Sequence, residues 1–511
     1  MLIETGFPLK TRGNDILPMP LPVCPRTVLY SKIMSPDLLK NILAELDERL
    51  CGGVISKVHQ IDGRDVILKI FCKGGQEHLI ISTHPLLSRL HLTEHPFTNP
   101  PVPKRFCAFL RSRIEGGRIE SFKQLDSERI ALITIKKRHD DGFETFVLRA
   151  ELTGKSSNII LLDNNGIILD AVRYFDVEGS QRPVAPGMTL APLPMPPAPQ
   201  KDTEAVTKAS AETWNEAADR HFSTLVNAEL AAAKRGRLLR AARTAEDRCK
   251  RKIANLNIDK ARAVKEQGYA AIGNMLLANF KALKRGLKEV EVVDYTIDPP
   301  TPVKVTLDER LGPKENCEKY FKRAKKGKTA LTMLATRIPQ TERELEYIQN
   351  LIYEIEAAET GPDLDAAQDE LVEAGYMKRD EATKKKGPVE AQAEPIRRSV
   401  SSEGFELLCG KTGAGNDLIV KRYGKDGDIW FHAKGCPGSH VVIKVAGRAD
   451  ELTKKTIEEA ATLAAKHSKA ANAAKVEVIY TDCCHVRKPK GAPPGTVTVS
   501  EYKTVVVRMG E

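Results

Sequence analysis

An aromatic ring and two imidazoles lie close together in the run DIWFHAKGCPGSHVVI, residues 428–443. Trp430 and His432 are two positions apart in an extended segment, so their side chains face the same side of a strand. The turn at 437–439 returns the chain and brings His440 beside them. An indole can stack on a base, and imidazoles can donate to phosphate. The run predicts a nucleic-acid surface; a buried structural cluster is the alternative that the residues alone leave open.

Basic residues elsewhere add candidate phosphate ligands. Arg487 and Lys488 follow in the run HVRKPKGAPPG, and residues 234–252 carry nine positive charges on an expected helix. A solvated coiled-coil face is the plain alternative for such a charge run. More lysines and arginines at 322–328, on the facing helix, favour an arm that contacts a polyanion. The candidate residues of this basic arm are Lys234, Arg235, Arg237, Arg240 and Arg243.

Metal and nucleotide sites are disfavoured by spacing. The histidines and cysteines at 432, 436, 440 and 483–485 include no Cys-x-x-Cys pair, and adjacent Cys483 and Cys484 are expected on opposite faces of a strand. Gly404 and the GKT run at 410–412 do not have the spacing of a phosphate-binding P-loop, and an apolar strand lies between them. We therefore expect no metal and no cofactor.

Alternating apolar runs and helical periodicity predict a multidomain α+β chain that positions these residues. A polyproline spacer at 190–200 marks the clearest boundary. The expected segments are an irregular arm at 1–27, an N-terminal α+β domain at 28–190, a helical region at 201–285 (helix-hairpin-helix-like, with the first coiled-coil arm), a strand hairpin with the second coiled-coil arm at 286–380, a linker at 381–395 and a small C-terminal α+β domain at 396–511.

The second coiled-coil arm has an apolar seam. Leucines and isoleucines between 331 and 355 repeat at alternating three- and four-residue spacing, which is typical of the a and d positions of a heptad. The upstream helical region is the expected antiparallel partner. Pro339 lies inside the seam and is expected to kink the helix or split it, because proline removes a backbone donor.

Composition limits the class of protein. The chain has 511 residues, a net charge of +11 and a pI near 9.0, which favours nucleic acid or an anionic membrane surface as partner. Ten cysteines are scattered without the dense spacing of a secreted disulfide scaffold. No export signal and no run of 18 apolar residues is recognised. A cytoplasmic protein without membrane contact is expected.

Several long runs resemble the NFACT family (fibronectin-binding protein A-like) of ribosome quality-control factors, in its bacterial type. The Asp-x-Trp-x-His, Pro-Gly-Ser-His and Arg-Lys-Pro-x-Gly runs are similar to that family's RNA-binding domain, and residues 106–122 and 151–163 are similar to its N-terminal domain. One departure is Thr412-Gly413, where the family has two asparagines. The RNA-binding residues that the run and the resemblance imply are Lys411, Asn416, Trp430, His432, Gly438, Ser439, His440, Arg487 and Lys488.

The resemblance also implies a tRNA site in the N-terminal domain. An Asp-Arg pair of the family recruits tRNA, and the aligned pair here is Glu128-Arg129. The arginine can still bind phosphate. The side chain of Glu128 is one methylene longer than that of the family's aspartate, so its carboxylate reaches a base edge differently. Glu151 and Lys155 are assigned to the same site. A surface ion pair between Glu128 and Arg129 is the alternative.

The function implied by the resemblance is a binding factor rather than an enzyme. It would bind large ribosomal subunits obstructed by peptidyl-tRNA and recruit charged tRNA, carrying alanine, so that the ribosome adds a C-terminal tail that marks the chain for degradation. Its expected partners are ribosomal RNA, the stalk-base protein, tRNA and nascent peptidyl-tRNA. The alternatives are a cell-surface fibronectin-binding adhesin and a nucleic-acid-binding protein of the DNA-repair glycosylase type. Neither an export signal nor an N-terminal amine site is recognised to support them.

Overall fold

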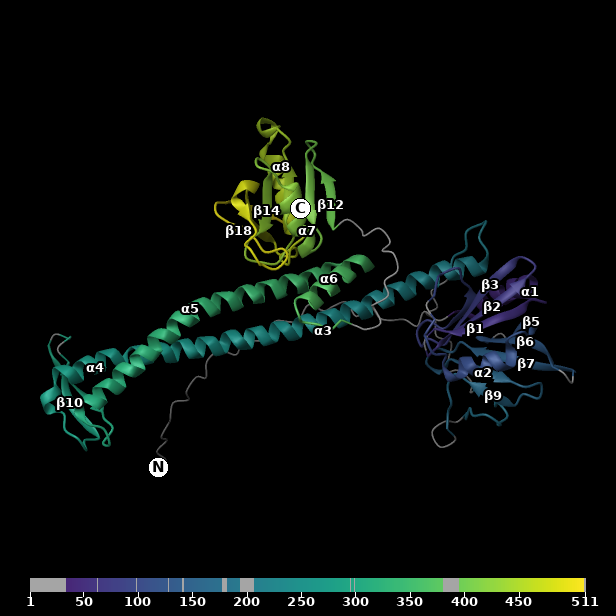
Figure 1. The fold of residues 1–511 in the computed structure, drawn as a ribbon. Coiled ribbons are helices and arrows are strands. Elements are labelled where there is room, and N and C mark those ends of the chain that lie inside the picture. Colours follow the sequence, from purple (N-terminus) through teal and green to yellow (C-terminus); the bar gives the residue numbers. More distant parts are fainter. Residues whose placement is uncertain are drawn as a thin grey trace, which may run out of the picture. The chain divides into compact units, whose positions relative to one another are not determined.

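The computed structural model describes residues 34–509, apart from 62, 98, 127, 140–141, 177–181, 194–205, 295, 298 and 380–394. It divides into two compact units, residues 1–229 and 230–511 (Figure 1). The expected irregular arm at 1–27 lies outside the described residues, as does the linker at 381–395 except for its last residue. No observation tests the finer domain boundaries, which stay predictions.

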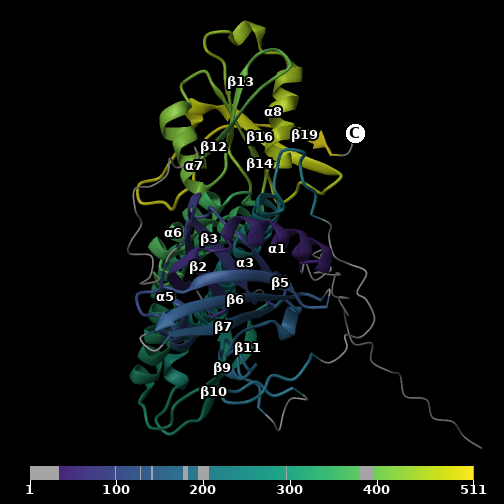
Figure 2. The ribbon, with the colours of Figure 1, turned by 90° about the vertical axis from the view of Figure 1, so that its right-hand side faces the viewer.

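The first unit is built on a nine-stranded antiparallel sheet in the order β4-β3-β2-β1-β5-β6-β7-β8-β9 (Figure 2). Its strands are β1 (Val54–Gln60), β2 (Asp65–Cys72), β3 (Gly75–Ser82), β4 (Arg89–Leu92), β5 (Arg118–Gln124), β6 (Ile130–His139), β7 (Gly142–Glu151), β8 (Asn158–Leu162) and β9 (Ile168–Ala171). Helices α1 (Pro36–Leu50) and α2 (Arg105–Ile114) bury their apolar faces in the same core as the sheet. The expected N-terminal α+β domain is confirmed.

Two long helices form the arm of the second unit, and Figure 1 shows them side by side. Its elements are α3 (Trp214–Gln267), α4 (Tyr269–Ala278), β10 (Glu289–Asp294), β11 (Thr301–Thr306), α5 (Pro313–Ala357) and α6 (Gly361–Glu373). Helix α3 begins in the first unit, where Ala218 and Phe222 join the core of the sheet. The antiparallel hairpin of β10 and β11 connects the two directions of the arm. The expected helical arm is thus confirmed.

The seam of α5 packs on α3 in antiparallel register. Leu334 and Ile338 contact Leu256 and Ala263, whereas Ile348, later in α5, contacts the earlier part of α3. Of the two expected outcomes at Pro339, the split is wrong, because α5 is one continuous helix of 45 residues. Pro339 lies on the exposed side of the helix, so the seam residues before and after it still pack on α3. The free energy gained by burying these residues outweighs the loss of one backbone hydrogen bond at the proline.

The arm is held at close range by one glycine. A Cβ built on Gly327 of α5 would lie 2.6 Å from the backbone nitrogen of Gln267 and 2.7 Å from the carbonyl oxygen of Ala263, both in α3. Real side chains do not approach backbone this closely, so only glycine permits this crossing.

The C-terminal domain is a six-stranded antiparallel sheet in the order β12-β13-β15-β14-β16-β19. Its elements are β12 (Ile396–Val400), β13 (Glu406–Gly410), α7 (Gly413–Leu418), β14 (Ile429–Ala433), β15 (Val441–Lys444), α8 (Lys454–Lys466), β16 (Lys475–Asp482), β17 (Val486–Arg487), β18 (Thr498–Val499) and β19 (Lys503–Arg508). Alanines of α8 cover one face of the sheet. Residues after α7 and the β17–β18 pair cover the other. This is the expected small α+β domain.

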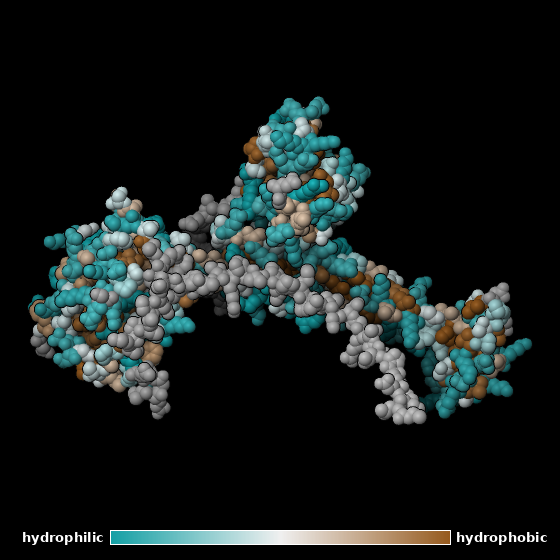
Figure 3. Space-filling model, turned by 180° about the vertical axis from the view of Figure 1, so that it is seen from behind, coloured by the Kyte–Doolittle hydropathy of each residue, from teal (hydrophilic) through white to brown (hydrophobic). Residues whose placement is uncertain are grey.

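The surface is mixed in character. Figure 3 shows a largely hydrophilic face with apolar patches over the arm, where Ile258, Val264 and Met333 are among the exposed large hydrophobic residues. Among the helices that the structure describes, none is long and apolar enough to cross a bilayer.

Candidate nucleic-acid interface

Glu128 and Arg129 lie in the connection between β5 and β6, where the backbone is tied on both sides. The Glu128 carbonyl accepts from Nε2 of Gln124 at 2.7 Å, and the Arg129 carbonyl accepts from the amide of Leu152 at 2.8 Å. This places Arg129 beside the turn that follows β7. The two side chains are half-buried, and the predicted alternative of an ion pair between them does not form in the described structure.

The guanidinium of Arg129 has no partner among the described residues. Burial lowers the pKa of Arg129 from its ordinary value, because desolvation disfavours the charged form. A half-buried cation without a carboxylate is an unsatisfied group that gains from an incoming anion. The geometry therefore supports a phosphate or carboxylate ligand at Arg129.

The turn beside Arg129 presents Lys155 to solvent in a short 3-10 segment, Gly154–Ser156. Its carbonyl accepts from Nη1 of Arg173 at 2.7 Å, which leaves the ammonium group exposed. The hydroxyl oxygens of Thr153 and Ser157 in the same turn are buried without a hydrogen-bond partner in the described structure. Sequence reasoning missed these two hydroxyls, because their surroundings come from elements far along the chain.

Glu151, which the resemblance assigns to the tRNA site, is a buried ion-pair residue in this structure. Its side chain is fully buried and accepts from Arg149 at 2.6 Å and from two nitrogens of Arg182 at 2.7 and 2.9 Å. A carboxylate enclosed by two arginines has no free oxygen to offer a ligand. Glu151 joins strand β7 to the segment around Arg182.

Replacing Glu151 with alanine is expected to destabilise the N-terminal domain by about 3–5 kcal/mol, because Arg149 and Arg182 would both lose the buried carboxylate that pairs with them. Urea unfolding of the full chain, followed by hydrogen exchange in β6 and β7, measures the change. Glu151→Gln, which keeps an acceptor oxygen, should lose less. Wild-type stability in Glu151→Ala together with lost tRNA binding would restore the ligand role.

Trp430 is buried rather than exposed. Its side chain is 1% exposed and packs with Ile396, Leu408, Ile419 and Val442 on the face of the sheet below α7. The ring is therefore not exposed for the predicted stacking on a base. The structural alternative is the one that the structure shows.

The two histidines belong to the same cluster. The ring of His432 stacks on Trp430 with centroids 5.8 Å apart, and the ring of His440 meets Trp430 edge-on at 5.1 Å. Burial lowers the pKa of His432 to about 4 and that of His440 well below its ordinary value. Both imidazoles are therefore neutral at physiological pH. Nε1 of Trp430 and Nδ1 of His440 are buried without a partner in the described part of the chain.

The turn at 437–439 is also structural. A Cβ on Gly438 would lie 2.9 Å from Cβ of Ser468, so glycine is needed for packing on the segment after α8. The amide of Ser439 donates to the His467 carbonyl at 2.8 Å. Oδ1 of Asn416 accepts from the amide of His440 at 2.9 Å. Gly438, Ser439 and Asn416 thus fix the turn, and their contacts with RNA stay predictions.

The basic residues of the C-terminal domain differ in availability. Lys488 forms an ion pair with Asp417 and donates to the Pro493 carbonyl at 3.0 Å, so its predicted phosphate contact is already replaced by a protein partner. Arg487 is exposed, and Lys411 is half-buried.

Cys483 and Cys484 lie in a 3-10 turn rather than in a strand, which corrects their expected placement. No group of potential metal ligands occurs within the described ranges.

Four of the five predicted residues of the basic arm have interaction partners, and two of the four pair with carboxylates. Lys234 pairs with Asp365 at 2.6 Å and Arg243 with Glu356 at 3.0 Å, while Arg235 donates to the carbonyls of Ile355 and Ala358. Because these cations already have partners, they are poor candidates for phosphate contacts. Arg237 also has an interaction partner. Of the five predicted residues, Arg240 alone is exposed without a carboxylate partner among the described residues.

Family models cover most of the chain. The model for the NFACT N-terminal and middle domains matches residues 38–205 and 194–389, and the model for the NFACT protein RNA binding domain matches residues 396–501. The chain belongs to the NFACT family. The predicted resemblance is confirmed.

Relatives of this NFACT chain include "Rqc2 homolog RqcH" of Bacillus subtilis, 31% identical over 91% of this chain and 95% of the relative. The human "Ribosome quality control complex subunit NEMF" is 26% identical over 27% of this chain and 12% of that protein. A solved structure of the C-terminal part of the fibronectin/fibrinogen-binding protein from Streptococcus suis covers 55% of this chain and 96% of its own, with 24% identity and a TM-score of 0.42.

Proposed function

We propose that this chain is a cytoplasmic ribosome quality-control factor. It binds large ribosomal subunits obstructed by peptidyl-tRNA and recruits charged tRNA, alanine by resemblance, to extend the stalled chain with a C-terminal tail that marks it for degradation. The observation that carries this proposal is the similarity to an Rqc2 homolog over 91% of the chain, which spans the N-terminal domain, the arm and the C-terminal domain together. The family's RNA-binding domain is included in that match.

The structure supports a binding role through positioning. In this proposal the ribosome forms the peptide bond. The protein raises the local concentration of tRNA and orients it, which lowers the activation barrier without a catalytic side chain of its own. The groups available for phosphate are Arg129 and Lys155 in the N-terminal domain, with Lys411 and Arg487 in the C-terminal domain. In this proposal Glu128, next to Arg129 in the chain, discriminates between base edges.

Affinity purification from cells, followed by sequencing of the recovered RNA, tests the proposal. Enrichment of large-subunit ribosomal RNA together with alanine tRNA is the expected result, and recovery should fall steeply with salt because many phosphates are contacted. Recovery of no RNA above background would refute the proposal. Enrichment of a different tRNA would keep the ribosomal role and change the amino acid that is added.

A further inference from the structure

Two arginines on one face of α3 keep their charges unpaired. Nearby cations on the same helix have carboxylate partners: Arg243 pairs with Glu356 and Lys250 with Glu246. Arg240 and Arg248 are exposed, and neither has a partner among the described residues. Helix α3 therefore carries cations that pair within the arm and exposed cations, Arg240 and Arg248 among them, that remain available.

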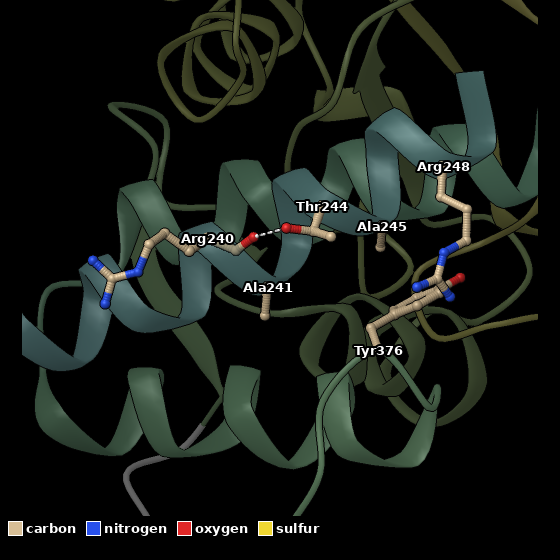
Figure 4. A pocket seen from close by; sticks show the side chains of 6 residues that line it. All are labelled: Arg240, Ala241, Thr244, Ala245, Arg248 and Tyr376. Atoms are coloured by element: carbon tan, nitrogen blue, oxygen red, sulfur yellow. Dashed lines mark hydrogen bonds between the residues drawn. The ribbon is translucent and has the colours of Figure 1, made fainter. Parts of the chain in front are cut away.

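Arg240 and Arg248 line the same cavity, of about 240 Å³ (Figure 4). Its other lining residues are Ala241, Thr244, Ala245 and Tyr376. Residues eight apart on a helix lie on one face, with Cα atoms about 12 Å apart at 1.5 Å per residue. Because alanines lie between the two arginines, a ligand can approach the helix backbone closely there. No carboxylate lines the cavity.

Tyr376 gives the cavity a fixed aromatic wall. It follows α6, and its amide donates to the Leu371 carbonyl at 2.9 Å, which anchors the backbone. The ring lies 6.5 Å from that of Tyr347, centroid to centroid, and is half-buried. Burial raises the pKa of Tyr376 to about 12, so the phenol stays protonated. Figure 4 shows Arg248 extending towards this ring, while the side chain of Arg240 points in the opposite direction, away from the ring.

We propose that Arg240, Arg248 and Tyr376 form an RNA-binding groove in which the two guanidiniums each hold a phosphate of one strand and the tyrosine contacts the nucleotide between them. Two forked cations, with no carboxylate among the residues that line the cavity, match the charge and bidentate geometry of phosphodiesters. Small helix residues between them leave room for a sugar-phosphate backbone. This inference rests on the proposed function and names an RNA contact separate from Arg129 and from the C-terminal domain.

The test compares two double variants of the full chain that remove the same charge from the same helix. Arg240→Gln with Arg248→Gln removes the unpaired cations. Arg243→Gln with Lys250→Gln is the matched control, because its cations are ion-paired within the arm. The probe is a fluorescein-labelled oligouridylate. Its dissociation constant is measured by fluorescence anisotropy at several KCl concentrations from about 50 to about 200 mM.

The first variant is expected to lower the magnitude of the slope of log K against log salt by about 1.4, since each phosphate contact on a single strand contributes about 0.7. The control should keep the wild-type slope. Equal slope changes in both variants would overturn the inference, because they would reflect general charge. An unchanged slope in the first variant would overturn it as well. Competition by polyglutamate as effective as by RNA would assign the groove to an acidic protein instead.

Failure of this inference is separable from failure of the proposed function. If wild-type protein recovers large-subunit ribosomal RNA from cells and the Arg240→Gln, Arg248→Gln variant keeps both that recovery and the salt slope, the groove alone is refuted. If wild-type protein recovers no RNA and binds no oligouridylate, both are refuted. Circular dichroism of both double variants checks that the arm remains helical.

Discussion

Replacing Trp430 with alanine is expected to destabilise the C-terminal domain by about 3–5 kcal/mol, as large-to-small changes of fully buried aromatic residues do. The ring is 1% exposed and fills the space between the sheet and the segment after α7. Its removal also takes away the surface on which His432 and His440 pack. Hydrogen exchange of β13, β14 and β15 in the full chain measures this loss directly, because the strands lose protection together.

Trp430→Phe separates packing from base stacking. Phenylalanine keeps most of the buried volume and an aromatic face, and it has no buried N–H, which in the wild type lacks a partner. We therefore expect Trp430→Phe to keep most of the stability and to bind RNA as the wild type does. An alanine variant with wild-type protection but weakened RNA binding would contradict the buried role and return Trp430 to the interface.

Replacing Arg129 with glutamine is expected to reduce tRNA recovery about 5- to 150-fold, which is the effect of losing one bidentate contact of about 1–3 kcal/mol. The domain itself should keep its stability, because the guanidinium makes no contact that the fold needs among the described residues. Large-subunit ribosomal RNA should still be recovered. Quantitative sequencing of the RNA that purifies with each variant measures the two classes separately.

Two further variants sharpen this test. Arg129→Lys keeps the charge but loses the planar fork, so intermediate recovery would indicate charge alone and complete loss would indicate bidentate recognition. Lys123→Gln removes an exposed positive charge from the neighbouring strand β5 and should leave tRNA recovery unchanged. Equal losses in Lys123→Gln and Arg129→Gln would contradict a specific site at Arg129.

The architecture could be predicted because it depends on local periodicity. Alternating apolar residues indicated the strands, and the three- and four-residue spacing in 331–355 indicated the buried face of α5. Pro339 shows the limit of local reasoning. Its effect on the helix was set by tertiary packing on α3, which the propensity of one residue does not report.

The binding residues were harder to predict because availability depends on distant partners. Residues two positions apart in a strand lie on the same face, and that face can be either core or surface. Spacing alone therefore could not show whether Trp430 is buried or exposed. Lys488 is neutralised by Asp417, which is 71 residues away in sequence, and Glu151 by Arg182, 31 residues away. Sequence reasoning identified the charges, and the pairing decided which of them remain free.

The contact at Gly327 limits how the arm can deform. A screw movement of α5 by one residue, about 1.5 Å along its axis and about 100° around it, would bring Lys326 or Lys328 to the point where the α3 backbone lies 2.6 Å from a Cβ built on Gly327. Neither side chain has room there, so the pair resists telescoping even where it can still bend. The two helices are therefore held in one register at this crossing, which keeps the hairpin end at a constant distance along α3.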